Sequence, residues 1–558
     1  MCPGIRSSIC CLMLTCTSAQ AFVTVGSSPG SGSCDFATIG AALTTGDDEI
    51  RLLSQSFFED VLIEDDVQLI GGFDTCADAD SNIQGDSLTL INGSGAGPVV
   101  SLVNASELDV ELRNLWIQGG VGSGSNDGGG IRVAVGGQLD INNTLLLSNQ
   151  ADSGGGININ NPPMPLDVTM VDSTIIGNSA GFFGGGLFCR GDVEITVDAG
   201  TGIAGNVANR GGGVYQTLGC VLILRSGVDS RTDSSLIGVV NNTANEDGGG
   251  LYLDQGAFVS IEGDADHPAA ITGNTATASG GGIYVVGSGS TVSLLSGLFE
   301  GNDAGNGGGV AASTGALIVS RVDSPGCWNR GKCILFDGNT AARGGAIHVA
   351  LAATASLSQV SFANNRANLG TALYLRDPQS NLFVEGSEFY GNGNGGVGGW
   401  NDSQVIRVYG GNTQLKHVTV ANNSVVVAAI GVTTTGGAAS LYVYNSIIHN
   451  AGVEPADYVG TPFTEHECLV VNELGQLNGT GIIITDPEFK NPGQNDYRLS
   501  GDSVAIDLCA DRSANYADLE GQVRGWDDPS YSNASGPFDA GADESYLNDI
   551  FFLDTFSQ

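Results

Sequence analysis

Short runs of alternating apolar and polar residues, separated by turns rich in glycine and asparagine, dominate this chain. Val193–Val197 and Ser290–Leu295 are typical, since branched or aliphatic side chains alternate there with polar ones. Such alternation predicts short strands with one buried face. Amphipathic stretches long enough for a helix are almost absent, so the pattern predicts an all-β protein.

A two-part repeat organises the middle of the chain. Its first part is an apolar residue, two further residues and an asparagine, and it recurs about every 30 residues. The second part is a glycine run ended by an aliphatic residue, from Gly128–Ile131 to Gly344–Ile347. The asparagines that we expect to stack as a ladder are Asn149, Asn178, Asn206, Asn242, Asn274, Asn302, Asn339 and Asn365.

This period suits one rung of a parallel β-helix, in which neighbouring rungs lie about 4.8 Å apart. We therefore expect an all-β solenoid, a right-handed parallel β-helix with a short N-terminal cap; the hand follows the rule for parallel crossovers. The asparagines are expected to adopt the left-handed conformation at a turn and to bond the backbone of neighbouring rungs. The glycines are expected to let the chain bend tightly.

The repeated motifs resemble those of the chlamydial polymorphic membrane proteins, which carry FxxN and GGA[ILV] repeats. Phe336–Asn339 followed by Gly344–Ile347 is the closest pair in this sequence, and the resemblance spans roughly residues 120–450. It implies the β-helix fold and, less specifically, a protein of the cell surface.

The two ends of the chain differ from the repeats. Residues 1–21 are interpreted as a secretory signal peptide, because an apolar stretch precedes Ala19–Ala21, with lipidation at Cys16 as a weaker alternative. Residues 22–119 are expected to hold the cap, with a helix near Ala37–Leu43, and the first rungs. The repeats are expected to occupy residues 120–450.

Residues 451–545 are expected to hold the last rungs and a segment that resembles the C-terminal part of the choice-of-anchor Q proteins. Asp518–Arg524 and Asp539–Glu544 carry this resemblance, although Val504 departs from its usual proline. Residues 546–558 resemble a tail found on exported proteins of Gram-negative bacteria. Together these features predict export to the cell surface, the outer membrane or the medium of a Gram-negative bacterium.

The cysteines agree with export. Four of the 12 lie in the signal peptide, and an even number in an exported chain predicts disulfides. Pairing between neighbours would join Cys34 to Cys76, Cys189 to Cys220, Cys327 to Cys333, and Cys468 to Cys509. A zinc site is the alternative, but the mature chain has no CxxC motif, so no metal site is expected.

The net charge of the chain excludes several classes of binding partner. The 558 residues include 60 acidic and 20 basic side chains, for a net charge of −40. A chain so acidic is not expected to bind nucleic acid or anionic lipid. No internal segment is apolar for long enough to predict a transmembrane span. Acidic side chains could hold calcium incidentally, but no calcium-binding repeat is present and no cofactor is expected.

The candidate binding surface consists of the residues that directly follow the aliphatic residue of each glycine run. By strand alternation these side chains point outward, one per rung, and they are expected to form a solvent-exposed stripe. Aromatic rings on such a stripe could bind sugars; alternatively they only stabilise the sheet. The candidates are Phe188, Tyr215, Tyr252, Tyr284, His348 and Tyr374.

We therefore expect a secreted or surface-attached protein with a structural or adhesive role, whose partner is an extracellular polysaccharide or a cell surface. No catalytic residue is assigned. The alternative is a polysaccharide lyase or glycoside hydrolase built on the same scaffold, with Arg343 and His348 on one rung as its starting point. The paired carboxylates Asp47–Asp48, Asp65–Asp66 and Asp527–Asp528 all lie outside the repeats.

Overall fold

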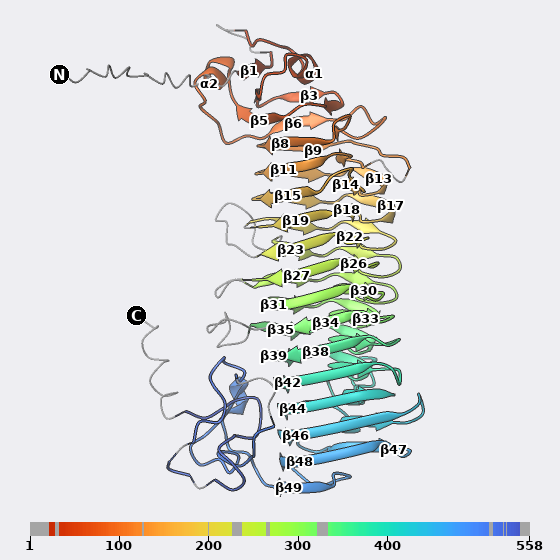
Figure 1. Ribbon diagram of the computed structural model, residues 1–558, viewed down its shortest axis with the longest axis vertical. Helices are drawn as coiled ribbons and strands as arrows, with labels where there is room; N and C mark the ends of the chain where they lie inside the picture. The colour runs from red at the N-terminus through yellow and green to blue at the C-terminus, as the bar shows by residue number, and fades with distance from the viewer. Residues whose placement is uncertain are drawn as a thin grey trace, which may run out of the picture.

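The computed structural model is an elongated parallel β-helix, with the N-terminal elements at one end and a separate C-terminal segment beside the other end (Figure 1). It describes residues 22–27, 33–124, 128–198, 200–225, 237–263, 268–320, 333–512, 517–527, 529–531 and 533–546. The expected signal peptide, Cys327, Asp528 and the expected tail, apart from Tyr546, lie outside the described residues.

Three parallel sheets, A, B and C, run along the coil, and strands in equivalent positions of successive rungs pair in register. The alternation and period of the sequence therefore predicted the parallel β-helix correctly. The hand of the coil stays a prediction.

Sheet A carries the pairs of strands that precede each ladder asparagine, fused into single long strands in the last rungs. It contains β1 (Phe22–Val25), β2 (Glu49–Leu53), β3 (Ser56–Phe58), β5 (Val67–Phe73), β6 (Thr89–Asn92), β8 (Glu107–Arg113), β9 (Leu115–Gln118), β11 (Gly136–Asn142), β12 (Leu145–Leu147), β15 (Leu166–Val171), β16 (Thr174–Ile176), β19 (Val193–Val197), β20 (Gly202–Ala204), β23 (Val221–Arg225), β24 (Gly238–Val240), β27 (Phe258–Glu262) and β28 (Ala269–Thr272). It continues with β31 (Thr291–Glu300), β34 (Leu317–Ser320), β35 (Ile334–Asp337), β38 (Thr354–Ser358), β39 (Val360–Ala363), β42 (Asn381–Tyr390), β44 (Gly411–Ala421), β46 (Ala439–His449), β48 (Phe463–Val471) and β49 (Gly479–Ile484).

Sheet C follows the ladder asparagines and is built from very short strands. It contains β13 (Gln150–Ser153), β17 (Ser179–Phe183), β21 (Val207–Ala208), β25 (Thr243–Ala244), β29 (Thr275–Ala276), β32 (Asp303–Asn306), β36 (Thr340–Arg343) and β40 (Arg366–Leu369).

Sheet B follows sheet C, and in the repeats its strands begin at the aliphatic residue of each glycine run. It contains β4 (Val61–Ile63), β7 (Val100–Leu102), β10 (Ile131–Val133), β14 (Ile157–Asn160), β18 (Leu187–Arg190), β22 (Val214–Thr217), β26 (Leu251–Leu253), β30 (Ile283–Val286), β33 (Val310–Ser313), β37 (Ile347–Val349), β41 (Leu373–Leu375), β43 (Gln404–Val408), β45 (Ala428–Thr433) and β47 (Glu454–Val459).

The ladder asparagines connect the rungs through their side-chain amides. Asn178 is typical: its Oδ1 accepts from the backbone N–H of Asn149 at 2.9 Å and from Asn149 Nδ2 at 3.1 Å. Its Nδ2 donates to the carbonyl of Leu146 in the preceding rung at 3.0 Å. The same bonds repeat along the coil, so a row of buried amides is satisfied inside the turn.

One expectation about this turn was wrong. The ladder asparagines are not the left-handed residues; the residue just before each of them is, as at Ser148 (φ 56°), Gly177 (φ 63°) and Asn241 (φ 53°). The preceding residue turns the chain, so the asparagine keeps an ordinary backbone and directs its amide along the coil axis. This explains why Gly, Asn or Ser precedes each ladder asparagine of the repeats.

Aliphatic and aromatic side chains from all three walls fill one continuous core along the coil. Phe299, Phe336, Phe362 and Phe389, the aromatic residues of the FxxN motifs, stack on one another with ring centroids 4.4, 5.4 and 4.6 Å apart. All four are fully buried. The repeat thus places one large ring per rung directly beside the ladder.

The N-terminal end is covered by α1 (Ile39–Leu43) and α2 (Cys76–Asp80), capped by Thr38 and Thr75 (Figure 1). The sequence predicted the first helix slightly too long, and α2 was not predicted. The disulfide Cys34–Cys76 links the chain before α1 to α2. The open strand edges of the first rung are thereby protected.

Two further disulfides follow the pairing between neighbours: Cys189–Cys220 and Cys468–Cys509. Cys333 is also disulfide-bonded, but Cys327 lies outside the described residues. Within the described part of the chain, no helix is both long enough and apolar enough to cross a membrane.

After β49 the chain leaves the coil and folds back beside sheet A (Figure 1). This C-terminal segment includes the antiparallel pair β50 (Phe489–Asn491) and β51 (Asp496–Leu499), joined by the 3-10 helix η2 (Pro492–Gln494). It contacts sheet A through long-range bonds, such as Gly541 N–H to the carbonyl of Asn445 at 2.9 Å.

Candidate functional site

The candidate aromatic residues form one column on the outer face of sheet B. Phe188 pairs in register with Tyr215, Tyr215 with Tyr252, and Tyr252 with Tyr284. The column continues through Ala311 to His348 and Tyr374. The residues on either side of most members, such as Leu251 and Leu253, belong to the core, whereas the column does not. Strand alternation therefore predicted the direction of these side chains correctly.

The column is covered, which corrects the expectation of a solvent-exposed stripe. Phe188, Tyr215 and Tyr252 are each only 6% exposed, and Tyr374 is 4% exposed. Each ring shields its neighbours: Tyr215 and Tyr252 stack with centroids 4.8 Å apart and planes 6° from parallel. Most of the column therefore packs as a second, outer hydrophobic cluster rather than standing free in water.

A pocket of about 380 Å³ lies at the end of the column that holds Phe188 and Tyr215. The pocket lies between the ends of sheet C strands and the ends of sheet B strands. Its lining residues are Asp152, Ser153, Asn160, Phe182, Phe183, Phe188, Arg190, Tyr215, Thr217, Leu218 and Gln255. Its volume falls in the usual range for small-molecule sites.

Aromatic rings form the apolar part of this pocket. Phe183 packs against Tyr215 with ring centroids 4.6 Å apart, and Phe182 lies 6.2 Å from Phe183. Phe182 is 55% exposed, which is unusual for so large an apolar side chain. Phe182 and Phe183, just before the glycine run of their rung, were not among the residues predicted from the sequence. The signal that could have found them is the unusual pair of aromatic residues at that position.

Polar groups surround these rings. The Tyr215 hydroxyl donates to Asp254 Oδ2 at 2.9 Å. Burial, followed by the neighbouring Asp254 carboxylate, raises the pKa of Tyr215 above its usual value of 10.0, so the phenol keeps its proton. One rung before Phe188 the column holds Asn158, which is fully buried; its Nδ2 donates to the carbonyl of Ser153 at 2.8 Å. Side-chain donors and acceptors therefore lie beside the exposed aromatic surface.

His348 lies farther along the same column and does not line this pocket. Its ring stacks on Tyr374, with centroids 5.4 Å apart. Burial, with smaller contributions from the guanidinium groups of Arg376 and Arg343, lowers the pKa of His348 to about 3. The imidazole is therefore uncharged at any pH above that value.

The structure does not bring the paired carboxylates to the column. Asp47–Asp48 lie between α1 and β2, and Asp65–Asp66 lie between β4 and β5. In the described part of the chain, no three His, Cys, Asp or Glu side chains gather where they could hold a metal ion.

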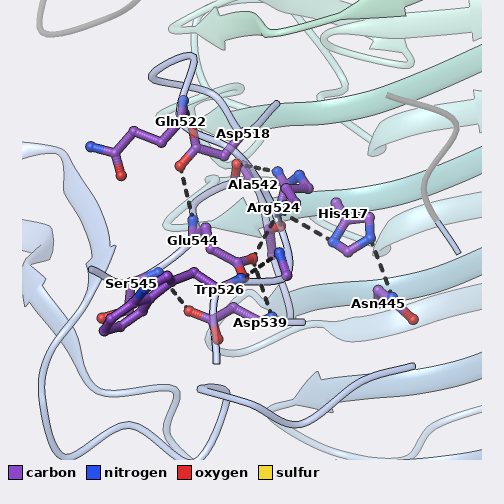
Figure 2. Close-up of polar contacts among 12 residues, drawn as sticks. His417, Asn445, Asp518, Gln522, Arg524, Trp526, Asp539, Ala542, Glu544 and Ser545 are labelled. Carbon is purple, nitrogen blue, oxygen red and sulfur yellow. Dashed lines mark hydrogen bonds and ion pairs between the residues drawn. The ribbon is translucent and has the colours of Figure 1, made fainter. Parts of the chain in front are cut away.

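The C-terminal segment holds a second concentration of polar side chains (Figure 2). Arg524 and Glu544 are buried, with Nη1 3.8 Å from Oε2, and Arg524 also donates to the carbonyls of Gly541 and Ala542. Glu544 accepts from the backbone N–H groups of Gly525 at 2.8 Å and Trp526 at 3.1 Å.

The two other carboxylates of this group also bind backbone. Asp518 accepts from the backbone N–H groups of Gln522 and Glu544, and Asp539 accepts from those of Asp507 and Ser545 (Figure 2). Burial raises the pKa values of Asp518 and Asp539, and it raises that of Glu544 to about 7. Because these carboxylates hold the loops of the segment in place, they are structural groups.

Two stretches of the repeat region match a known protein family. The Chlamydia polymorphic membrane protein (Chlamydia_PMP) repeat matches residues 268–286 and 334–350. Each match begins at a sheet A strand (β28 or β35), passes a ladder asparagine (Asn274 or Asn339) and continues into sheet B. No curated protein matches the chain. The chain is thus a parallel β-helix with repeats of the polymorphic membrane protein type, and this repeat indicates a protein of the cell surface or outer membrane.

Proposed function

We propose that this protein is exported to the surface of a Gram-negative bacterium, where it acts as an adhesive β-helix that binds glycans at the pocket over Phe182, Phe183, Phe188 and Tyr215. The single observation that carries this proposal is the pocket itself, where the exposed ring of Phe182 lies beside the covered aromatic column.

The chemistry of the pocket suits a sugar. A pyranose ring has an apolar face that packs on an aromatic ring and hydroxyl groups that need hydrogen-bond partners. Phe182 and Phe183 supply the aromatic surface, while Asn160, Thr217 and Gln255 line the same pocket and can donate to or accept from hydroxyls. Phe182 lies on β17 of sheet C beside the column, and it leaves more than half of its surface exposed for a sugar ring to pack on.

Export and surface attachment are supported by two independent features. The polymorphic membrane protein repeat points to the cell surface. The disulfides Cys34–Cys76, Cys189–Cys220 and Cys468–Cys509 suit an oxidising compartment outside the cytoplasm.

Affinity electrophoresis through gels that contain neutral or acidic polysaccharides tests the proposal. Wild-type chain should be retarded by at least one polysaccharide, and Phe182→Ala should lose most of that retardation. Phe182 is exposed, so its removal should leave the fold intact. Phe58→Ala is the matched control, since Phe58 on β3 is 76% exposed and far from the pocket. Equal retardation of both variants and the wild type would contradict the proposal.

A further inference from the structure

Arginine side chains gather at the other end of the aromatic column, on the rungs of His348, Tyr374 and Arg407. Arg407 pairs in register with Tyr374, directly after His348 in the column. Arg343 ends β36 on the same rung as His348, and Arg376 follows β41. At about 4.8 Å per rung, the five rungs from Tyr215 to Tyr374 place this cluster about 24 Å from the pocket.

Among the described residues, Arg343, Arg376 and Arg407 lack the close carboxylate partners that several other arginines have. In so acidic a protein a carboxylate is usually at hand: Arg51, Arg113, Arg210, Arg366, Arg498 and Arg512 each pair with one at 2.9 Å or less. Arg343 instead donates to the neutral Asn306 Oδ1 at 3.3 Å, and Arg376 reaches Asp377 only at 4.0 Å.

Arg407 is the most unusual of these three arginines. It is half-buried, and its Nε is buried without a hydrogen-bond partner in the described part of the chain. Burial lowers its pKa, while Tyr374, Asp457 and Tyr409 oppose this effect. A guanidinium that is partly desolvated and forms no close ion pair has the most to gain from an incoming anion.

A second observation points to a ligand here. His348 is 6% exposed, and its Nε2 is buried with no hydrogen-bond partner among the described residues. A buried polar atom without a partner, close enough to Arg343 and Arg376 to feel their charges, is costly in a finished core but is expected where a bound group completes the bonding. The charged groups around this ring are Arg343 and Arg376, with Asp377 next to Arg376.

We infer that the Arg343, Arg376 and Arg407 end of the column binds an anionic group carried by a glycan, either a uronate carboxylate or a sulfate ester. Guanidinium groups bind both oxyanions through paired N–H donors. The inference rests on the proposed glycan binding and names the class of glycan: an acidic chain that reaches both the aromatic pocket and the arginine cluster.

Isothermal titration with three probes tests this inference: a short oligogalacturonate, its fully methyl-esterified form, and a sulfated oligosaccharide of similar length. The esterified form keeps the sugar shape but removes the charge. Wild-type chain should bind the carboxylate form, the sulfated form or both at least about tenfold more tightly than the ester, as expected for charge-assisted hydrogen bonds. The charged probe that binds tightly shows whether the site takes a uronate carboxylate or a sulfate ester.

The Arg343→Gln/Arg376→Gln double variant and the Arg407→Gln variant should each lose most of this preference while binding of the ester stays unchanged. The two exposed arginines of the double variant can be replaced without loss of the fold. Arg225→Gln, which removes an exposed arginine of sheet A, is the control. Equal binding of charged and uncharged probes by the wild type, or a preference that survives in both arginine variants, would overturn the inference.

The two proposals can fail separately. If Phe182→Ala weakens all three probes alike but the arginine variants change nothing, the pocket binds glycans and the arginine cluster does not. If the wild type binds none of the probes, the anionic site is overturned, and the neutral polysaccharides of the electrophoresis panel decide the proposed function alone.

Discussion

Arg524 of the C-terminal segment reaches His417 of β44, with Nη1 3.2 Å from the ring Nδ1, although the two residues are 107 positions apart in the chain. Both side chains are almost completely buried. Burial and the adjacent guanidinium lower the pKa of His417 well below 6.5, so the neutral ring can accept a hydrogen bond from Arg524 (Figure 2). This contact holds the C-terminal segment against the side of the coil.

The docked segment should be more stable in mild acid than at neutral pH. Burial raises the pKa of Glu544 from 4.5 to about 7, so the folded state binds this proton more tightly than the unfolded state. The stabilisation is fully present below about pH 4.5 and is lost as the pH rises through about 7. Limited proteolysis across this range should therefore release the segment faster at pH 8 than at pH 5.

The Glu544→Gln variant separates the contribution of Glu544 to pH-dependent docking from the repulsion among the other carboxylates of this acidic chain. The uncharged amide imitates the protonated carboxyl, so the difference between pH 5 and pH 8 should shrink. Asp502→Asn, which removes an exposed carboxylate from the same segment, should keep the wild-type difference. An unchanged pH dependence in Glu544→Gln would show that Glu544 does not control docking.

The disulfide Cys468–Cys509 is expected to hold the segment to the coil. It joins β48 to the segment across 41 residues, so its loss should lower the stability of docking by about 2–4 kcal/mol. The double variant Cys468→Ser/Cys509→Ser should be cleaved within residues 486–546 by low concentrations of protease. Cys34→Ser/Cys76→Ser should leave this region resistant, because that bond lies at the opposite end; equal cleavage of both variants would argue against a local role.

The asparagine ladder should contribute strongly to the stability of the coil. Asn242→Ala removes the acceptor of the Asn206 N–H group and Nδ2, and it removes the donor to the carbonyl of Ile203. Each buried group left without a partner costs about 1–3 kcal/mol, so we expect a loss of about 3 kcal/mol or more. The midpoint of unfolding in guanidinium chloride measures it.

Asn245→Ala is the matched control for the ladder. Asn245 lies three residues later and is exposed, and its side-chain amide donates to the side chain of Asn209. Its removal should change the midpoint little. Similar losses from both variants would mean that the ladder amides are no more important than surface amides.

The sequence predicted those parts of the structure that repeat. The period of asparagines and glycine runs predicted the rungs, the ladder and the outward direction of Tyr215 and Tyr252, because each depends on local spacing. It did not predict that the column would be covered, since this depends on how far neighbouring rings shield one another. Phe182 was missed because a single rung carries it.

The C-terminal segment could not be placed from the sequence for a different reason. The contact of Arg524 with His417, and that of Gln359 Nε2 with the carbonyl of Asp518, join residues 107 and 159 positions apart. No period or short motif reports such a contact, and the acidic motifs of the segment showed only a resemblance. The buried role of Glu544 becomes evident only with the backbone N–H groups that surround it.

We expect no hydrolysis of glycosidic bonds at the aromatic pocket. Hydrolysis of a glycosidic bond normally needs two carboxyl groups across the scissile bond, and Asp152 is the one carboxylate among the lining residues described for this pocket. Incubation of the full chain and calcium with neutral and acidic polysaccharides should therefore release no new reducing ends. Product from any of them would favour an enzyme, and variants of Arg343 and His348 would then be tested first.

We propose that glycans bind in the pocket lined by Phe182, Phe183, Phe188 and Tyr215. The most direct test is a crystal structure of the full chain soaked with an oligosaccharide from a polysaccharide that retards it in electrophoresis. Difference density is expected for a sugar ring packed on Phe182 or Phe183 and within hydrogen-bond reach of Asn160, Thr217 or Gln255. Density confined to another face of the coil, with this pocket empty, would contradict it.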